Sequence, residues 1–125
     1  NRLASKLTIH EINDESDLNK ISFDDYDVLV DALFGTGLSR SLSGIYESVI
    51  SRLNKAKAYR IAVDVPSGLL IDAPSAGVVF KANFTVTFQL PKLAFLLPEN
   101  FSSVGNWQAV RIGLDKNCIE SADTN

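Results

Sequence analysis

The sequence predicts an α/β fold built on a parallel sheet. Two stretches, 27–31 and 59–63, are short, apolar and rich in β-branched residues, as buried strands are. A glycine-rich loop and a helical pattern at 44–57 lie between them. A strand that is joined to the next strand through a helix forms a right-handed crossover and a parallel pair. Each strand runs into an aspartate and a glycine turn, so both acids are expected at one edge of the sheet.

Composition agrees with a single soluble domain. A chain of 125 residues is long enough to bury roughly two thirds of the surface that it exposes when unfolded. Hydrophobic residues make up 46% and charged residues 22%, which excludes a disordered chain. The net charge of -3 argues against a nucleic-acid-binding surface, which normally needs a basic patch.

The chain shows no targeting or membrane signal. No apolar run approaches the roughly 20 residues of a membrane helix, and no signal peptide opens the sequence. The single cysteine, Cys118, cannot form an internal disulfide, so we expect a reducing, cytoplasmic location. The sequence has no methionine and starts at Asn1, which suggests a piece of a longer polypeptide. We expect one domain over 1–114 and a polar tail or linker over 115–125.

The first third of the chain leads into the sheet. Residues 6–10 are expected to form a short strand. Asn13 or Asp14 can cap a short helix that runs to about Ile21, because both side chains accept hydrogen bonds from the free amides of a first turn. Residues 23–26 make the turn into the first buried strand, which ends at Asp31 or just beyond.

The helix at 44–57 is indicated by apolar spacing. Ile45, Val49, Ile50 and Leu53 recur at three- and four-residue intervals and so share one face. Lysines near its carboxyl end suit the helix dipole.

The second half of the chain continues the sheet. Residues 67–77 are rich in Pro, Gly, Ser and Asp and predict a loop. Residues 84–88 alternate Phe and Val with Thr, as a strand does, whereas 93–97 fit a strand or a helix equally well. A last strand is expected at 107–112.

Aromatic residues are assigned mainly to the interior. We expect Trp107 in the core or at an interface. The phenylalanines expected in the core are Phe84, Phe88, Phe95 and Phe101.

The loop after the first strand is a candidate phosphate site. Gly35-Thr36-Gly37 lets backbone amides approach an anion, and a following helix would favour negative charge. Arg40 can add a charge-assisted hydrogen bond. The alternative is a plain tight turn, because the third glycine of the dinucleotide fingerprint is absent from its usual place.

Asp31 and Asp64 are the stronger candidates. Carboxylates at neighbouring strand ends can hold a cation, or leave one carboxyl free to transfer protons. The alternative role for each is to cap a helix or loop. Ser67 offers a hydroxyl for ion coordination or for a turn hydrogen bond. It is no nucleophile candidate, because the Gly-x-Ser-x-Gly elbow is missing.

Two further residues are weaker candidates. His10, the only histidine, is expected to be structural or solvated, since no triad partner is spaced around it. Lys92 follows a strand end and could meet a phosphate, but a solvated surface position is the commoner role for such a lysine.

Several of these stretches resemble the NAD(P)H-hydrate epimerase family, the YjeF N-terminal domain. The Asp-Val-Pro-Ser-Gly block at this distance from the Asp-Ala-Leu-Phe-Gly-Thr-Gly block is specific. The similarity covers most of the chain, from about Asp25 to Gly113. The stretches that carry it are 31–38, 64–68, 81–88 with Lys92, Gly105, and 112–113.

The resemblance implies a Rossmann-like three-layer α/β/α sandwich with a mostly parallel sheet. It also implies a repair reaction, in which the enzyme interconverts the R and S epimers of hydrated NADH and NADPH (NADHX and NADPHX). A companion dehydratase regenerates the cofactor and in many bacterial relatives is fused after this domain. The polar end of the chain, 115–125, lies where such a linker would begin. By analogy with the family, we expect a homo-oligomer.

The resemblance also implies roles for individual residues. Asp31 and Ser67 match the ligands of a potassium ion, the expected cofactor. Asp64 matches the acid that meets the substrate and is the expected catalytic acid/base. The residues that match the substrate-phosphate loop are Gly35, Thr36, Gly37, Leu38, Ser39, Arg40 and Ser41.

The chain departs from the family pattern at two places. An upstream Asn-Asn-Gly-Gly-Asp-Gly block, with a further potassium ligand and more substrate contacts, is absent together with its strand and helix. The family also often has Asp where this chain has Asn83. The 125 residues alone are therefore expected to hold half of the site, to fold poorly and to have little or no epimerase activity.

Two other functions stay open from the sequence. A non-catalytic binding or scaffold module would keep the fold and lose the acid or the glycine loop. Another nucleotide-binding Rossmann-like enzyme would bind ordinary NAD tightly.

Overall fold

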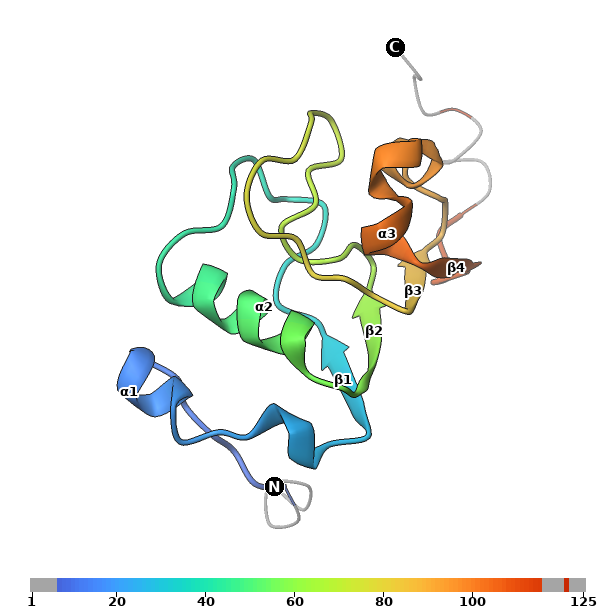
Figure 1. Cartoon of the computed structure of the whole chain (residues 1–125). Coiled ribbons are helices and arrows are strands. Elements are labelled where there is room, and N and C mark those ends of the chain that lie inside the picture. The colour runs from blue at the N-terminus through green and yellow to red at the C-terminus, as the bar shows by residue number, and fades with distance from the viewer. Residues whose placement is uncertain (1–6, 116–120, 122–125) are drawn as a thin grey trace.

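The computed structural model describes residues 7–115 and 121, which form a small α/β domain (Figure 1). Its strands are β1 (Val28–Asp31), β2 (Tyr59–Val63), β3 (Phe84–Phe88) and β4 (Asn106–Val110). Its α-helices are α1 (Glu15–Leu18), α2 (Ile45–Lys55) and α3 (Phe101–Val104). Three 3₁₀ turns complete it: η1 (Phe23–Asp25), η2 (Leu93–Leu96) and η3 (Pro98–Asn100).

All four strands are parallel, in the order β1-β2-β3-β4. Asp31 pairs with Ala62 across β1 and β2, and Val63 pairs with Val86 across β2 and β3. The carboxyl ends of the strands therefore lie along one edge, and in Figure 1 the arrows of β1 and β2 point toward the long loops. The predicted α/β class with a Rossmann-like parallel sheet is confirmed.

Helix α2 forms the crossover between β1 and β2, as predicted. It buries Ile50 and Leu53, two of the residues whose spacing indicated a helix. Gly44 precedes it with a φ of 61°, a conformation that glycine adopts without a side-chain clash. The helix ends at Lys55, where Ala56 turns to an extended conformation and the cations of the last turn suit the dipole.

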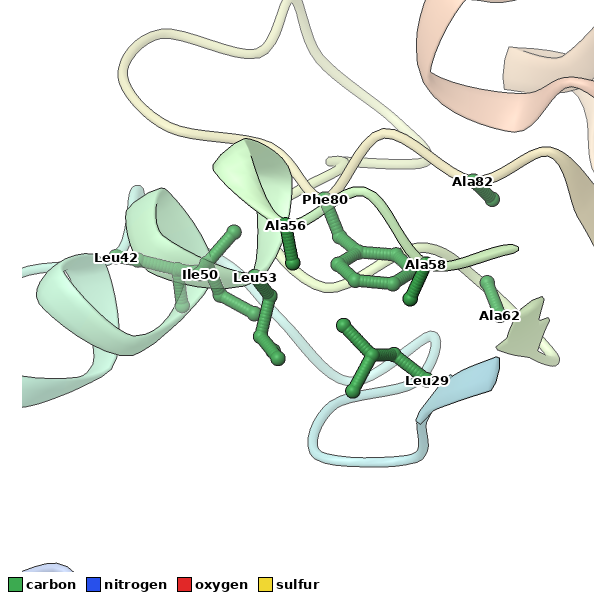
Figure 2. Close-up of a cluster of buried hydrophobic side chains, with 9 residues drawn as sticks. All are labelled: Leu29, Leu42, Ile50, Leu53, Ala56, Ala58, Ala62, Phe80 and Ala82. Atoms are coloured by element: carbon green, nitrogen blue, oxygen red, sulfur yellow. The ribbon is translucent and has the colours of Figure 1, made fainter. Parts of the chain in front are cut away.

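The main hydrophobic core lies between α2 and the sheet (Figure 2). Phe80 is fully buried in it and lies in a loop rather than in a strand. The cluster consists of Leu29, Leu42, Ile50, Leu53, Ala56, Ala58, Ala62, Phe80 and Ala82. A second cluster joins the end of β2 to α3 and η2, and consists of Val65, Leu69, Ala94, Phe95 and Val104.

The phenylalanine prediction was right for Phe95, which is buried, whereas Phe84 is half-buried. It was wrong for Phe88 and Phe101, which are exposed, because alternation and spacing do not show which face is covered. Trp107 is also partly exposed and packs against Phe95, with ring centroids 6.1 Å apart.

The two faces of the sheet differ in burial. On one face, Leu29, Ala62 and Thr85 are buried beneath the helices, and the Thr85 hydroxyl donates to the Val104 carbonyl of α3. On the other face, Val28 is 49% and Val30 is 61% exposed. The rest of that face is half-buried or exposed: Tyr59, Ile61, Val63, Phe84, Val86 and Phe88. We call this surface the open face; β1 and β4 are the two edge strands of the sheet.

The amino-terminal predictions were partly right. Asp14 caps α1, since its Oδ1 accepts from the amides of Ser16 and Asp17, but the helix ends at Leu18 instead of Ile21. The strand expected at 6–10 is not formed over the described residues 7–10, which are exposed. The predicted turn at 23–26 is the 3₁₀ turn η1.

The carboxyl-terminal part follows the prediction closely. The ambiguous segment at 93–97 forms the 3₁₀ turn η2, and the last strand begins one residue earlier and ends two residues earlier than expected. Most of the predicted tail, 116–120 and 122–125, lies outside the described residues. Among the helices of the described part, none has the length and apolar character needed to cross a membrane.

Candidate functional site

Asp31 and Ser67 form a buried hydrogen-bonded pair at the ends of β1 and β2. Asp31 is only 1% exposed. The Ser67 hydroxyl donates to Asp31 Oδ1 at 2.6 Å, and the Ser67 amide donates to Oδ2 at 2.7 Å. The Ser67 hydroxyl also accepts from the Phe34 amide at 3.1 Å. The structure thus brings together the two residues expected to bind potassium.

Gly68 allows the turn that carries Ser67 to pack closely. Its φ is 94°, and a Cβ at this position would lie 2.3 Å from the Val78 carbonyl oxygen. Any other residue would force the backbone apart. The Asp-Val-Pro-Ser-Gly turn is therefore fixed against the following loop, and Ser67 with it.

Burial raises the pKa of the Asp31 carboxyl above its ordinary value, and the hydrogen bonds from Ser67 oppose that rise. Neither ion pair of the described residues includes Asp31. A buried carboxylate without a cation is costly, and a bound cation would offset that cost. The carboxylate and hydroxyl oxygens are hard ligands of the kind that alkali and alkaline-earth cations prefer. The donor chemistry fits a potassium ion, with further oxygens required to complete its shell.

The described residues form no metal centre built from His, Cys, Asp and Glu side chains. Over residues 7–115 and 121, no three His, Cys, Asp or Glu side chains gather where they could bind one ion. His10 is exposed, in agreement with the expectation that it is solvated.

Asp64 lies at the end of β2 in a strained conformation. Its φ is 66°, in the left-handed region that aspartate tolerates better than most residues. The side chain is 16% exposed. Its Oδ1 accepts from the Phe88 amide at 3.1 Å and from the Thr87 hydroxyl at 3.3 Å. The carboxyl group is therefore held from β3, the neighbouring strand.

Lys92 completes the environment of Asp64. Its ammonium nitrogen lies 3.0 Å from Asp64 Oδ1, and the lysine side chain is also 16% exposed. It donates to the carbonyls of Phe88 and Leu90 at 3.1 and 3.2 Å. The expectation of a solvated lysine was wrong, because the chain after β3 turns back at Gln89, where φ is 61°.

The glycine loop approaches Asp64 from the end of β1. A Cβ at Gly35 would lie 3.4 Å from Asp64 Oδ2. The next residues, Thr36, Gly37, Leu38 and Ser39, line a pocket of about 260 Å³. Its other wall consists of Leu70, Asp72 and Ala73.

The last two residues of the expected phosphate loop lie outside that pocket lining. Arg40 is exposed, and Ser41 is half-buried near Gly77, where a Cβ would lie 3.5 Å from the Ser41 Cβ. Helix α2 begins only at Ile45, so the loop is separated from the helix amino terminus that was expected to help bind an anion.

The two aspartates are held separately. Asp31 bonds to Ser67, whereas Asp64 bonds to residues of and after β3. The shared rim that the sequence predicted exists, but it contains two distinct carboxyl environments.

No sequence signal pointed to Thr87, and Lys92 was expected after a strand end, where it lies, but without Asp64 as its partner. The strand pattern of 84–88 placed the Thr87 side chain on one face of β3 without showing that this face meets Asp64. For Lys92, only its distance from a strand end was available as a signal.

Comparison with known proteins places the chain among relatives of known name. The family model described as "YjeF-related protein N-terminus" matches residues 2–94. A bifunctional NAD(P)H-hydrate repair enzyme Nnr from Thermofilum pendens is 51% identical over 73 residues, covering 58% of this chain and 14% of the relative.

Two further relatives agree with this match. The bifunctional Nnr enzyme of Moorella thermoacetica is 37% identical over 100 residues, which is 79% of this chain and 19% of that enzyme. An NAD(P)H-hydrate epimerase of Roseobacter litoralis is 50% identical over 72 residues, which is 54% of this chain and 32% of the relative. The chain thus spans a third or less of the length of these three relatives. Since the family model covers most of its residues, the chain belongs to the family of YjeF-related protein N-termini.

Proposed function

We propose that the protein is an NAD(P)H-hydrate epimerase, which interconverts the R and S epimers of NADHX and NADPHX. The observation that carries the proposal is the placement of Asp64, held at Oδ1 with Oδ2 toward Gly35 of the glycine loop. Relatives up to 50% identical bear the name of this epimerase.

In this proposal Asp64 is the acid/base. The carboxyl group gives a proton to the hydroxyl of the hydrated ring, so the carbon–oxygen bond breaks and water leaves a planar carbon. Water then adds to the opposite face and returns a proton to the carboxylate, so the carbon inverts and no net proton or water is consumed. The strained backbone and the contacts from β3 hold the group in one orientation, which a proton transfer requires.

The glycine loop is proposed to bind the substrate phosphates. Gly35, Thr36, Gly37, Leu38 and Ser39 supply closely spaced backbone amides, and four of them line the 260 Å³ pocket. The remaining members, Arg40 and Ser41, extend the loop beyond the pocket and would contact the more distant part of a dinucleotide. Arg40 is exposed and can approach a phosphate from solvent.

Asp31 and Ser67 are proposed to hold a potassium ion. When bound, the ion would supply positive charge beside the ends of β1 and β2. Asp31 loses the cost of a buried charge, and Ser67 turns its oxygen toward the ion instead of donating its proton to the carboxylate.

The proposal extends to the full-length protein and its partners. The Thermofilum and Moorella relatives are named as bifunctional enzymes. We infer from these names that a dehydratase accompanies the epimerase in the full-length protein. From the composition and the resemblance to the family, we propose that the full-length protein is a cytoplasmic homo-oligomer and that its partner is NADHX or NADPHX rather than nucleic acid.

The test is epimerisation by the purified full-length protein. One epimer of NADHX is isolated, and its return to the equilibrium mixture is followed by chromatography with and without potassium. We expect faster equilibration than the spontaneous rate, and a further increase with potassium. A folded protein that leaves the rate at the spontaneous value would contradict the proposal and would favour a non-catalytic binding module.

A further inference from the structure

We propose that Lys92 is a positioning residue, which fixes Oδ1 of Asp64 so that Oδ2 is the oxygen that exchanges protons with the substrate. This inference rests on the epimerase function proposed above. It assigns different tasks to the two oxygens of one carboxyl group and gives Lys92 a task other than binding phosphate.

Oδ1 of Asp64 is fully engaged. It accepts hydrogen bonds from the Phe88 amide at 3.1 Å and the Thr87 hydroxyl at 3.3 Å, and the Lys92 ammonium forms an ion pair with it at 3.0 Å. A carboxylate oxygen has about two lone-pair directions, so the two hydrogen bonds use both of them and the ammonium adds its charge. An oxygen so engaged is a poor proton acceptor.

The Lys92 ammonium is held by contacts within the protein. An ammonium group has three N–H donors and no acceptor. Two of them are donated to the carbonyls of Phe88 and Leu90, and the charge is paired with Asp64 Oδ1 at 3.0 Å. A substrate phosphate would have to displace one of these contacts, so the geometry favours positioning over phosphate binding.

The other oxygen of the Asp64 carboxyl group, Oδ2, is left available. Among the hydrogen bonds of the described residues, none is donated to this oxygen, although Oδ1 of the same group receives several. Gly35 of the glycine loop lies close to Oδ2, since a Cβ built on Gly35 would stand 3.4 Å from it. Gly35 directly precedes Thr36, which lines the pocket between the two loops. Oδ2 therefore faces the side from which the substrate is proposed to bind.

The backbone supports the same assignment. Asp64 is held at a φ of 66°, and its amide donates to the Val86 carbonyl at 2.7 Å. With the backbone and Oδ1 both fixed, rotation of the carboxyl group would break contacts on β3 and with Lys92. The two oxygens cannot exchange places at low cost.

The test removes the ammonium from full-length protein and then returns it. We expect Lys92→Ala to lower kcat for NADHX epimerisation about 100-fold, the usual effect of a misplaced catalytic group, and to change KM less than about threefold. Ethylammonium in the buffer should restore at least about a tenfold part of the lost kcat, because it carries the same donor group. Tetramethylammonium, which has no N–H, should restore nothing.

The matched control is Lys81→Ala. Lys81 is an exposed lysine just before β3, at the amino end of the sheet and opposite the edge that holds Asp64. Its replacement should leave kcat and KM unchanged, with or without ethylammonium. If Lys92→Ala does not fold, Lys92→Met keeps the aliphatic stem and removes only the charge, and thermal unfolding shows which variants are folded.

Several results would overturn the inference. A folded Lys92 variant with normal kcat would do so, as would a loss confined to KM, which would make Lys92 a substrate ligand. Failure of ethylammonium to restore activity in a folded Lys92→Ala protein would also count against it. If the wild-type protein itself does not epimerise NADHX, the proposed function fails first and this inference falls with it.

Discussion

Asp31 and Asp64 follow the same local pattern, a buried strand that ends in an aspartate, yet they occupy opposite environments. Asp31 is enclosed and bonded to a neutral serine, and its pKa is raised by burial. Asp64 is partly exposed, strained in its backbone and paired with the Lys92 ammonium. Among the described residues, the second carboxyl forms an ion pair with a cation and the first forms none. The environment of each acid is therefore set by a residue that follows the neighbouring strand, Ser67 for Asp31 and Lys92 for Asp64. The strand pattern that the two acids share does not set it.

The largest difference should appear when each aspartate is replaced by asparagine. Asp64→Asn keeps the shape and removes the proton-transfer group, so kcat for NADHX epimerisation should fall about 10²- to 10⁴-fold. The exposed Asp27, at the other end of β1, is the control, and Asp27→Asn should have no effect. Asp31→Asn should instead abolish the response to potassium. Loss of that response in Asp64→Asn alone would contradict the division of roles.

Removal of the Ser67 hydroxyl should mainly affect stability. Ser67→Ala takes a donor from the buried Asp31 carboxyl and an acceptor from the Phe34 amide. The free energy of unfolding should fall by about 2 kcal/mol, the usual value for a hydrogen bond to a charged group. Urea unfolding measures it, with the exposed Ser43→Ala as control. Equal stability of the two variants would show that the Asp31–Ser67 contact contributes nothing.

A methyl group at Gly35 should affect activity more than folding. Its Cβ would lie 3.4 Å from Asp64 Oδ2, an ordinary contact distance, and Gly35 does not have a positive φ. We expect Gly35→Ala to fold normally and to lose about tenfold in kcat, because the methyl group shields the oxygen proposed to exchange protons. Thermal unfolding of Gly35→Ala is the control that shows whether the added methyl group leaves the fold intact. Full activity of Gly35→Ala would argue against Oδ2.

The smallest expected effect is on the pH dependence of stability. Because the pKa of Asp31 is raised in the folded state, that state binds more protons than the unfolded chain from about pH 4 up to the raised value. Asp31 therefore contributes stability at low pH that is lost as pH rises through this window. Thermal unfolding should show a flatter pH dependence for Asp31→Asn than for wild type. Potassium should stabilise the wild type on the alkaline side of the window, where the carboxylate is charged.

The strands and α2 were predictable because their signal is local. The alternation in 84–88 follows from the two-residue period of a strand, and the helical spacing in 44–57 follows from which side chains face the core. The strand expected at 6–10 is not formed over the described residues 7–10. Leu7 and Ile9 are exposed there, and none of the described strands lies beside them.

The site was predictable only in part. The two aspartates could be placed at one rim because parallel strands end together, and the resemblance paired Asp31 with Ser67. The contacts of Lys92 and Thr87 with Asp64 depend on how the chain turns after β3, and nothing periodic in the sequence specifies that turn. Phe80 was missed likewise, because a buried loop residue has no pattern around it.

The open face and the edge strand β1 are expected to make the isolated chain aggregate. An apolar edge strand such as β1 can accept a strand from another molecule, and sheets with such edges aggregate unless charges guard them. Light scattering per unit mass of the isolated chain should therefore rise with its concentration. A lysine introduced at Val30, which is 61% exposed, should act as a gatekeeper and delay that rise without disturbing the core on the opposite face.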